Sequence, residues 1–361
     1  MIVQFKMMKS SIAFLIICLI IGSCKSSSQE EVIVETASHT NSIAILDSII
    51  QISKTNAYNT KNVNWDILSK DMFAISERHD SIDKIGKPTE YMFKTLGDFH
   101  GMLMYDYKVA FSYKPEKEGV PRDSIWDAIT TTKITLPYEV IGKIIENTNI
   151  AYIEIVGTGV MQEEDIIQAR DTIRSVICSL KIQEPNGWIL DLRCNTGGNM
   201  HPMMAGIGEL IPDADLGGDT TDDISFDSLW SLKDGNFLEN GYAHYGQELQ
   251  CSETKNTKKI VVLTSRFTAS AGEVVASSLK GQDNIVLIGE KTAGLSSTNG
   301  WYVLPEKWVL APMQAYFMSL DKTVHKDGIN PDIIVNERLD LSNLFQGKMI
   351  ERAIKWIHTG S

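Results

Sequence analysis

Residues 188–198 read WILDLRCNTGG, and this stretch decides the fold class. An apolar segment of strand length ends in a polar turn with paired glycines, and a helical pattern follows through Met203 to Leu210. Continuous apolar runs that alternate with helices are typical of parallel sheets covered on both faces. We therefore predict an α/β core with a mainly parallel sheet. The other predicted strands are residues 150–156, 259–264 and 285–289, and the other predicted helices are residues 165–180 and 270–279.

The chain around this core divides into further parts. Residues 41–101 carry apolar side chains near the helical period and predict an N-terminal helical unit. Residues 102–149 alternate around a turn rich in lysine, glycine and proline, which predicts a hairpin or a small β cap. The core then occupies residues 150–361, and it includes antiparallel strands at 301–317 and a closing helix at 344–357.

The N-terminus predicts export and a lipid anchor. Residues 1–23 combine two lysines, a compact apolar run and small residues before Cys24, which is typical of a lipoprotein signal peptide. Acylation of Cys24, palmitate included, would hold the chain at a membrane of the cell envelope, facing the periplasm or the exterior. An ordinary signal peptide with an incidental cysteine is the alternative. Residues 24–40 then form a tether whose start, KSSSQEE, is predicted to be structureless.

Charge and cysteine content exclude several classes of function. The net charge of −12 argues against a nucleic-acid partner and is compatible with cationic partners or with solubility alone. Apart from Cys24, the mature chain keeps Cys178, Cys194 and Cys251 without CxxC spacing, which predicts neither a zinc site nor a disulfide framework. We expect Cys178 and Cys194 to be buried, and we predict no metal and no cofactor.

The glycine pair Gly197-Gly198 is a candidate oxyanion site. Paired glycines let the backbone approach a substrate carbonyl and present N–H groups to it. A phosphate-binding turn is an alternative, but the chain lacks the lysine and serine or threonine of a P-loop here. A tight turn without a ligand also remains open.

Ser270 is a candidate nucleophile within TASAGE, residues 268–273. It follows a buried strand and opens a helix of small residues, so the helix N-terminus offers unpaired N–H groups beside its hydroxyl. The N–H of Ala271 is then a candidate second oxyanion donor. Serine is also a common helix N-cap, and these six residues alone favour that role.

Four motifs in order carry a family resemblance. They are the strand with its glycine pair, TASAGE, GEKTAG at 289–294 and GINPDI at 328–333. Together they resemble the S41 peptidases, which include C-terminal processing and tricorn-like proteases, over about residues 150–335. The resemblance implies a crotonase/ClpP-like core, Ser270 as nucleophile, and Gly197 or Gly198 with Ala271 as oxyanion donors.

The chain departs from the processing proteases at their catalytic lysine, where it has Leu295, and Lys291 is a weak substitute. A serine hydroxyl needs a base. LGDFHG at 96–101 resembles the segment that carries a histidine base in lysine-less members, so we predict His100 as the base. The third catalytic residue stays open between Asp327 and His325. Glu273 and Glu290 are predicted supporting residues.

The layout also resembles the PDZ-less, nisin-resistance-type members, because residues 102–149 are too few for an inserted domain. That resemblance implies that the cap forms one wall of a peptide tunnel. The leading hypothesis is a membrane-anchored serine endopeptidase that cleaves extended peptides, cationic peptides among them, by a Ser270/His100 dyad. A non-catalytic peptide-binding lipoprotein and a serine esterase are the alternatives.

Overall fold

The computed structural model describes residues 28–106, 108–114, 124–134, 138–246, 251 and 258–361. The chain divides into two compact units, Met1–Ala44 and Ile45–Ser361. The predicted signal peptide and Cys24 lie outside the described residues. Helix α1 (Ser28–Asn56) begins inside the stretch that was predicted to be structureless, so that prediction was wrong.

Among the residues that the structure describes, no helix is both long enough and apolar enough to cross a membrane.

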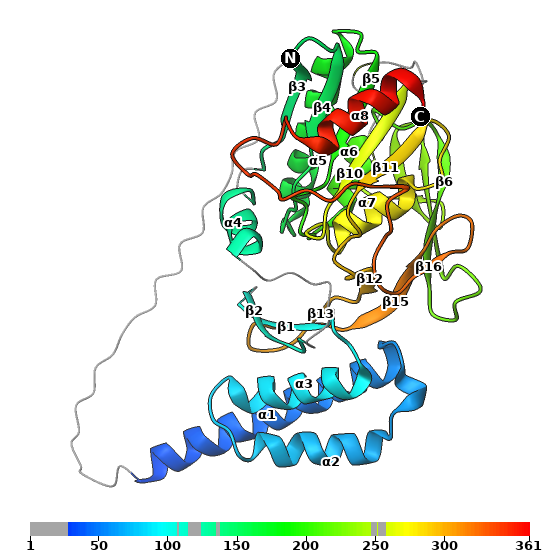
Figure 1. Cartoon of the computed structure of the whole chain (residues 1–361). Helices are drawn as coiled ribbons and strands as arrows, with labels where there is room; N and C mark the ends of the chain where they lie inside the picture. The colour runs from blue at the N-terminus through cyan, green and yellow to red at the C-terminus, as the bar shows by residue number, and fades with distance from the viewer. Residues whose placement is uncertain (1–27, 107, 115–123, 135–137, 247–250, 252–257) are drawn as a thin grey trace, which may run out of the picture. The chain divides into compact units, whose positions relative to one another are not determined.

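The second unit contains the predicted α/β core (Figure 1). Its central sheet has six strands in the order β17-β11-β10-β5-β4-β3. All neighbours are parallel except β3, which pairs with β4 in antiparallel fashion and extends the sheet upstream of residue 150. The strands are β3 (Ile141–Ile145), β4 (Ile150–Glu154), β5 (Gly187–Asp191), β10 (Lys259–Thr264), β11 (Ile285–Gly289) and β17 (Ile333–Ile334).

Successive side chains along a strand of this sheet pack into two different hydrophobic cores, one on each face. Trp188 and Leu190 of β5 pack in one core with helices α5 (Glu163–Lys181), α6 (Met200–Ile207) and α7 (Ala271–Leu279). Ile189, between them, packs in the other core with helix α8 (Lys348–Thr359). Figure 1 shows α8 and the pair α5 and α6 on opposite faces of the sheet. Burial on both faces explains the continuous apolar runs.

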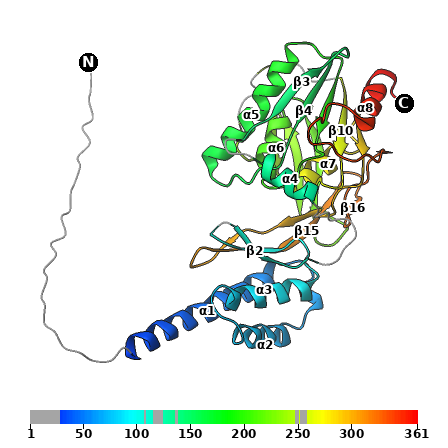
Figure 2. The same cartoon turned by 60° about the vertical axis from the view of Figure 1, so that its left-hand side comes forward.

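The N-terminal helices pack against a small sheet. Helices α2 (Trp65–Ser76) and α3 (Asp83–Leu96), with α1 from Ile45 onward, share a core with a four-stranded sheet of order β13-β14-β1-β2. Figure 2 shows β2 beside α3. A short helix, α4 (Ser124–Thr132), lies in the predicted cap and was not expected. The strands are β1 (Met102–Tyr105), β2 (Lys108–Ser112), β13 (Tyr302–Val303) and β14 (Trp308–Ala311).

A third sheet, mostly absent from the sequence-based prediction, lies beside the core. It has the order β12-β15-β6-β7-β8-β9, with β16 paired to β15. Helix α7 contacts both β6 and β15, so this sheet adjoins the helix that Ser270 opens. A short helix η1 (Thr60–Asn62) completes the elements. The strands are β6 (Ala214–Thr220), β7 (Ser228–Lys233), β8 (Asn236–Glu239), β9 (Tyr242–Ala243), β12 (Ser297–Asn299), β15 (Met313–Met318) and β16 (Val324–His325).

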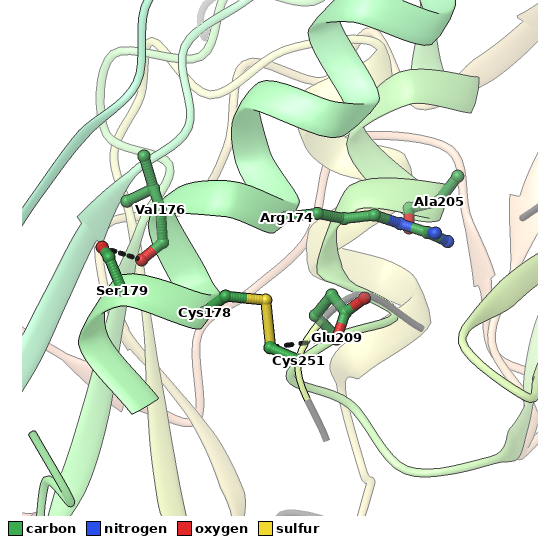
Figure 3. The surroundings of a disulfide bond; sticks show 7 residues. All are labelled: Arg174, Val176, Cys178, Ser179, Ala205, Glu209 and Cys251. Atoms are coloured by element: carbon green, nitrogen blue, oxygen red, sulfur yellow. Dashed lines mark hydrogen bonds between the residues drawn. A yellow bond between two sulfur atoms is a disulfide. The ribbon is translucent and has the colours of Figure 1, made fainter. Parts of the chain in front are cut away.

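The cysteines correct one prediction. Cys178 of α5 forms a disulfide with Cys251, 73 residues away, and Glu209 lies beside it (Figure 3). The prediction that Cys178 is a buried free thiol, outside any disulfide, was wrong because the long separation leaves no local spacing signal. Cys194 is free and buried, as predicted.

Candidate active site

Ser270 occupies a strained backbone position between β10 and α7. Its φ and ψ are 50° and −117°, and the N–H of Gly272 donates to the carbonyl of Ala269 at 2.9 Å. These features define a type II′ turn with Ser270 in the position that favours glycine. Non-glycine residues rarely adopt such angles, and when they do they concentrate at functional sites.

Glu273, one turn into α7, holds this strained segment. Its side chain is fully buried, and Oε2 accepts a hydrogen bond from the backbone N–H of Ser270 at 2.9 Å. Its other oxygen, Oε1, accepts from the hydroxyl of Thr292 and from the N–H of Gly294 at 3.0 Å. Burial raises the pKa of Glu273 to about 7, although these hydrogen bonds favour the anion. Glu273 therefore joins the serine segment to the segment that carries Leu295.

Gly197, the first residue of the glycine pair, lies directly beside Ser270. Gly197 and Gly198 have φ of 104° and 114°, which side chains rarely adopt. A Cβ added to Gly197 would lie 2.7 Å from Cβ of Ser270. The N–H of Gly197 donates to Oδ1 of Asn195 at 3.0 Å. The N–H groups of Gly198 and Ala271 make no hydrogen bond to any residue that the structure describes.

Asn195 ties the two segments together and was not singled out from the sequence. Its carbonyl accepts the N–H of Ala269 at 2.9 Å, and its side-chain amide donates to the carbonyl of Ile155 at 3.1 Å. It is completely buried. A buried asparagine between an apolar strand and a glycine pair is the sequence signal that could have identified it, because such a side chain needs backbone partners.

His100 lies in the turn between α3 and β1, and its backbone is fixed from both sides. Asp98 accepts the N–H groups of His100 and Gly101 through Oδ1, and that of Met313 in β15 through Oδ2 at 2.8 Å. The amide of Asn299 in β12 donates to the carbonyl of His100 at 3.0 Å. Burial raises the pKa of Asp98 to about 6. Asp98 therefore shapes the turn rather than orienting the imidazole ring.

The ring of His100 contacts a serine that the sequence did not indicate. Nδ1 lies 2.7 Å from Oγ of Ser297. Burial lowers the pKa of His100 to about 4, so the imidazole is neutral at neutral pH. Among the described residues, no hydrogen bond joins His100 to Ser270. Ser297 follows Leu295 by two positions, and only the pairing of β12 with β15 places it beside the histidine turn.

Leu295, in the position of the missing lysine, belongs to a small hydrophobic cluster. It packs with Ala269 and Ala293, and Phe99 and Trp126 pack against this cluster. Ala269 precedes Ser270 and Phe99 precedes His100, so this cluster brings the two segments into the same neighbourhood. No cation stands at position 295 to activate the serine.

The remaining predicted residues lie as follows. Glu290 accepts the N–H of Arg266 at 3.3 Å, in the turn before Ser270. Nε2 of His325 lies 2.6 Å from Oγ of Ser319, and burial lowers the pKa of His325 to about 4. The side chain of Asp327 is exposed. Within the described residues, the groups of side chains that could hold a metal include neither Ser270 nor His100.

The sequence is similar to those of two known proteins. The chain is 32% identical over 173 residues to the nisin-resistance protein of Lactococcus lactis subsp. lactis, covering 47% of this chain and 52% of that protein. It is 27% identical over 202 residues to the carboxy-terminal processing protease CtpA of Bacillus subtilis, covering 55% of this chain and 38% of that protein. The matches thus span about half or less of these relatives.

A solved structure of a lipoprotein from Streptococcus agalactiae has a TM-score of 0.64, at 18% identity, over 88% of this chain and 96% of that one. At this identity the likeness concerns the fold alone. The sequence model of peptidase family S41 matches residues 149–335, which is more than half of the chain. The strand with the glycine pair, the Ser270 segment and the Leu295 segment all fall inside this range, and the chain belongs to peptidase family S41.

Proposed function

We propose that this chain is a serine endopeptidase that cleaves extended peptides with Ser270 as nucleophile and His100 as general base. The observation that carries the proposal is the strained type II′ conformation of Ser270 beside Gly197, with the N–H groups of Gly198 and Ala271 making no hydrogen bond to a described residue. A serine on a strained turn between a strand and a helix, with unpaired backbone N–H groups in the neighbouring turns, is the arrangement of a nucleophile elbow with its oxyanion hole.

The mechanism assigns one task to each group. Nε2 of His100 removes the proton from Oγ of Ser270, which attacks the substrate carbonyl carbon. The oxyanion that forms accepts hydrogen bonds from Gly198 and Ala271. His100 then gives the proton to the leaving amine, and water hydrolyses the acyl-enzyme through the same base. Gly197 is not a donor in this scheme because its N–H is bonded to Asn195.

Ser297 takes the place of the third catalytic residue, which the sequence left open. Its hydroxyl on Nδ1 fixes the ring, so that Nε2 is the nitrogen that exchanges the proton. The absent contact between His100 and Ser270 is compatible with this role, because catalytic hydrogen bonds are often long without substrate and tighten when it binds.

We further propose that the chain is exported and anchored to the cell envelope through lipid on Cys24. The Cys178–Cys251 disulfide supports export, since disulfides persist in oxidising compartments. The net charge of −12 favours a cationic peptide as substrate. Turnover of other envelope peptides is the competing substrate class.

A non-catalytic peptide-binding lipoprotein is the second candidate, and Leu295 is the observation that favours it. A fluorophosphonate probe separates the two candidates, because it labels an activated serine and leaves a binder unmodified. We expect labelling of the parent chain, no labelling of Ser270→Ala, and labelling slowed at least a hundredfold in His100→Gln. Ser342→Ala, which changes an exposed serine, is the control and retains labelling.

If the wild-type chain is labelled and His100→Gln is labelled at the same rate, His100 is not the base. No labelling of the wild-type chain would favour the binder. A panel of peptides and acyl esters then distinguishes a peptidase from an esterase, because the proposal requires faster hydrolysis of the peptides.

A further inference from the structure

Two histidines and a glutamate converge near the start of α6, shortly after the glycine pair in sequence. His201 is the second residue of α6, Glu239 ends β8, and His244 follows β9. Their potential ligand atoms all lie within 4.8 Å of one another. Nε2 of His244 is 3.0 Å from Oε2 of Glu239, and the ring centroids of the two histidines are 4.8 Å apart. Three separate segments therefore present ligand atoms to one point.

His201 has an unsatisfied nitrogen at this point. Its Nδ1 atom is buried and has no hydrogen-bond partner among the described residues. Buried polar atoms are nearly always paired, so an unpaired imidazole nitrogen needs an explanation. The rings of Phe237 and Tyr245 lie 6.0 Å and 5.9 Å from the His201 ring, and they offer no acceptor there.

An arrangement without a metal must account for all three residues. A direct contact between Glu239 and His244 explains two of them. It leaves the buried Nδ1 atom of His201 without a partner among the described residues.

We propose that His201, Glu239 and His244 bind one divalent transition metal of the zinc class. Two imidazoles and one carboxylate are a recognised zinc ligand set. The side chains of His244 and Glu239 are 40% and 23% exposed, so solvent can reach the site and supply a fourth ligand. The oxygen-preferring cations Ca²⁺ and Mg²⁺ do not suit a site with two nitrogens.

The metal would join the β8–β9 hairpin to the start of α6. Asn199, the N-cap of α6, accepts the backbone N–H of His201 at 3.0 Å and directly follows Gly198. The inference does not depend on the proposed peptidase activity, because metal binding is measured directly.

The other ligand group, Cys178, Glu209 and Cys251, is not a candidate because its two sulfurs form the disulfide.

The test is a titration of the oxidised full-length chain, freed of metal by EDTA, with Zn²⁺ followed by calorimetry. We expect one Zn²⁺ per chain and a rise in melting temperature on loading. Each of His201→Asn, Glu239→Gln and His244→Asn should weaken Zn²⁺ binding at least tenfold. His358→Asn, which changes an exposed histidine of α8, is the matched control and should bind as the parent does.

Co²⁺ provides a second readout that reports on geometry, because a tetrahedral site with nitrogen ligands gives an intense visible spectrum. Melting curves in EDTA establish that each variant folds before metal is added. The proposal is overturned if the parent binds no Zn²⁺, or if His201→Asn and His244→Asn bind it as tightly as the parent. Equal binding of Ca²⁺ or Mg²⁺ would also overturn it.

Discussion

Nδ1 of His100 and Oγ of Ser297 lie 2.7 Å apart, although 197 residues separate the two in the chain. The histidine comes from the turn after α3 and the serine from the first residue of β12. The contact leaves Nε2 as the ring nitrogen for proton transfer, so the orientation of the proposed base depends on a strand far from it in sequence.

Removing the Ser297 hydroxyl should therefore slow acylation. We expect Ser297→Ala to lower kcat for peptide cleavage by about tenfold to a hundredfold with little change in KM, because a freely rotating base loses its alignment. Ser297→Thr keeps a hydroxyl and should recover most of the rate. Steady-state kinetics on both variants test this, and a Ser297→Ala protein with parental kcat would contradict the orienting role.

The pH dependence of acylation should show the lowered pKa of His100. The base must be neutral, and burial lowers the pKa of His100 to about 4, so kcat/KM should persist well below pH 6.5 and fall only near pH 4. The rate of fluorophosphonate labelling between pH 4 and 8 measures this. An inflection near pH 7 that disappears in Glu273→Gln would belong to Glu273 instead. A midpoint near 6.5 in both proteins would contradict the prediction.

Gly197 should tolerate no side chain. Gly197→Ala would place Cβ 2.7 Å from Cβ of Ser270 at a φ of 104°, so we expect fluorophosphonate labelling to be lost. Gly281→Ala is a matched control, because Gly281 also has a positive φ, of 81°, but has no atom within 4 Å of the added Cβ. The control should lose about 1–2 kcal/mol of stability from the backbone alone and keep its labelling. If both variants are labelled equally, Gly197 is not part of the active site.

Glu273 should make stability depend on pH in a definite direction. Its pKa is raised to about 7 in the folded chain, so its stabilising contribution is complete below the ordinary pKa and is lost as the pH rises through 7. The stability advantage of the parent over Glu273→Gln should therefore shrink by about 2–3 kcal/mol between pH 4 and pH 8. Urea unfolding at the two pH values measures it, with Glu351→Gln as the exposed control on α8. If the stability advantage of the parent instead grows with pH, the pKa of Glu273 is not raised in the folded chain.

The disulfide should contribute to folding stability as a constraint on the unfolded chain. Cys178→Ser with Cys251→Ser opens a loop of 73 residues, and we expect a loss of about 2–4 kcal/mol in the free energy of unfolding. Reductant should destabilise the parent and leave the double variant unchanged. If reductant affects both equally, the loss does not come from this bond.

Sequence patterns predicted the parts of the molecule that follow local rules. The apolar strand at 188–192 and the amphipathic helix at 165–180 have clear periodicity, and both appear in the structure within two or three residues. Strands β6 to β9 were missed, because short, half-exposed antiparallel strands such as β7 (Ser228–Lys233) combine polar and apolar residues without a clear pattern.

Contacts between distant segments limit how much of the candidate site can be predicted from the sequence. Ser270 and Gly197 could be singled out as candidates because the pattern that suggests their roles is local to a turn. Asn195 also carries a local signal, but its partners Ala269 and Ile155 lie in other segments. The role of Ser297 arises only when β12 pairs with β15 and brings this serine to the histidine turn. The Cys178–Cys251 bond was missed for the same reason.

The backbone angles of Ser270 have a consequence for the evolution of the chain. At φ 50° and ψ −117°, a glycine is less strained than any residue with a side chain. Ser270→Gly should therefore abolish nucleophilic chemistry and increase stability by about 1 kcal/mol, whereas Ser270→Ala abolishes the chemistry without that gain. Under the proposed function, this single substitution would convert the peptidase into a more stable binding protein, and selection for turnover would be what keeps the serine in place.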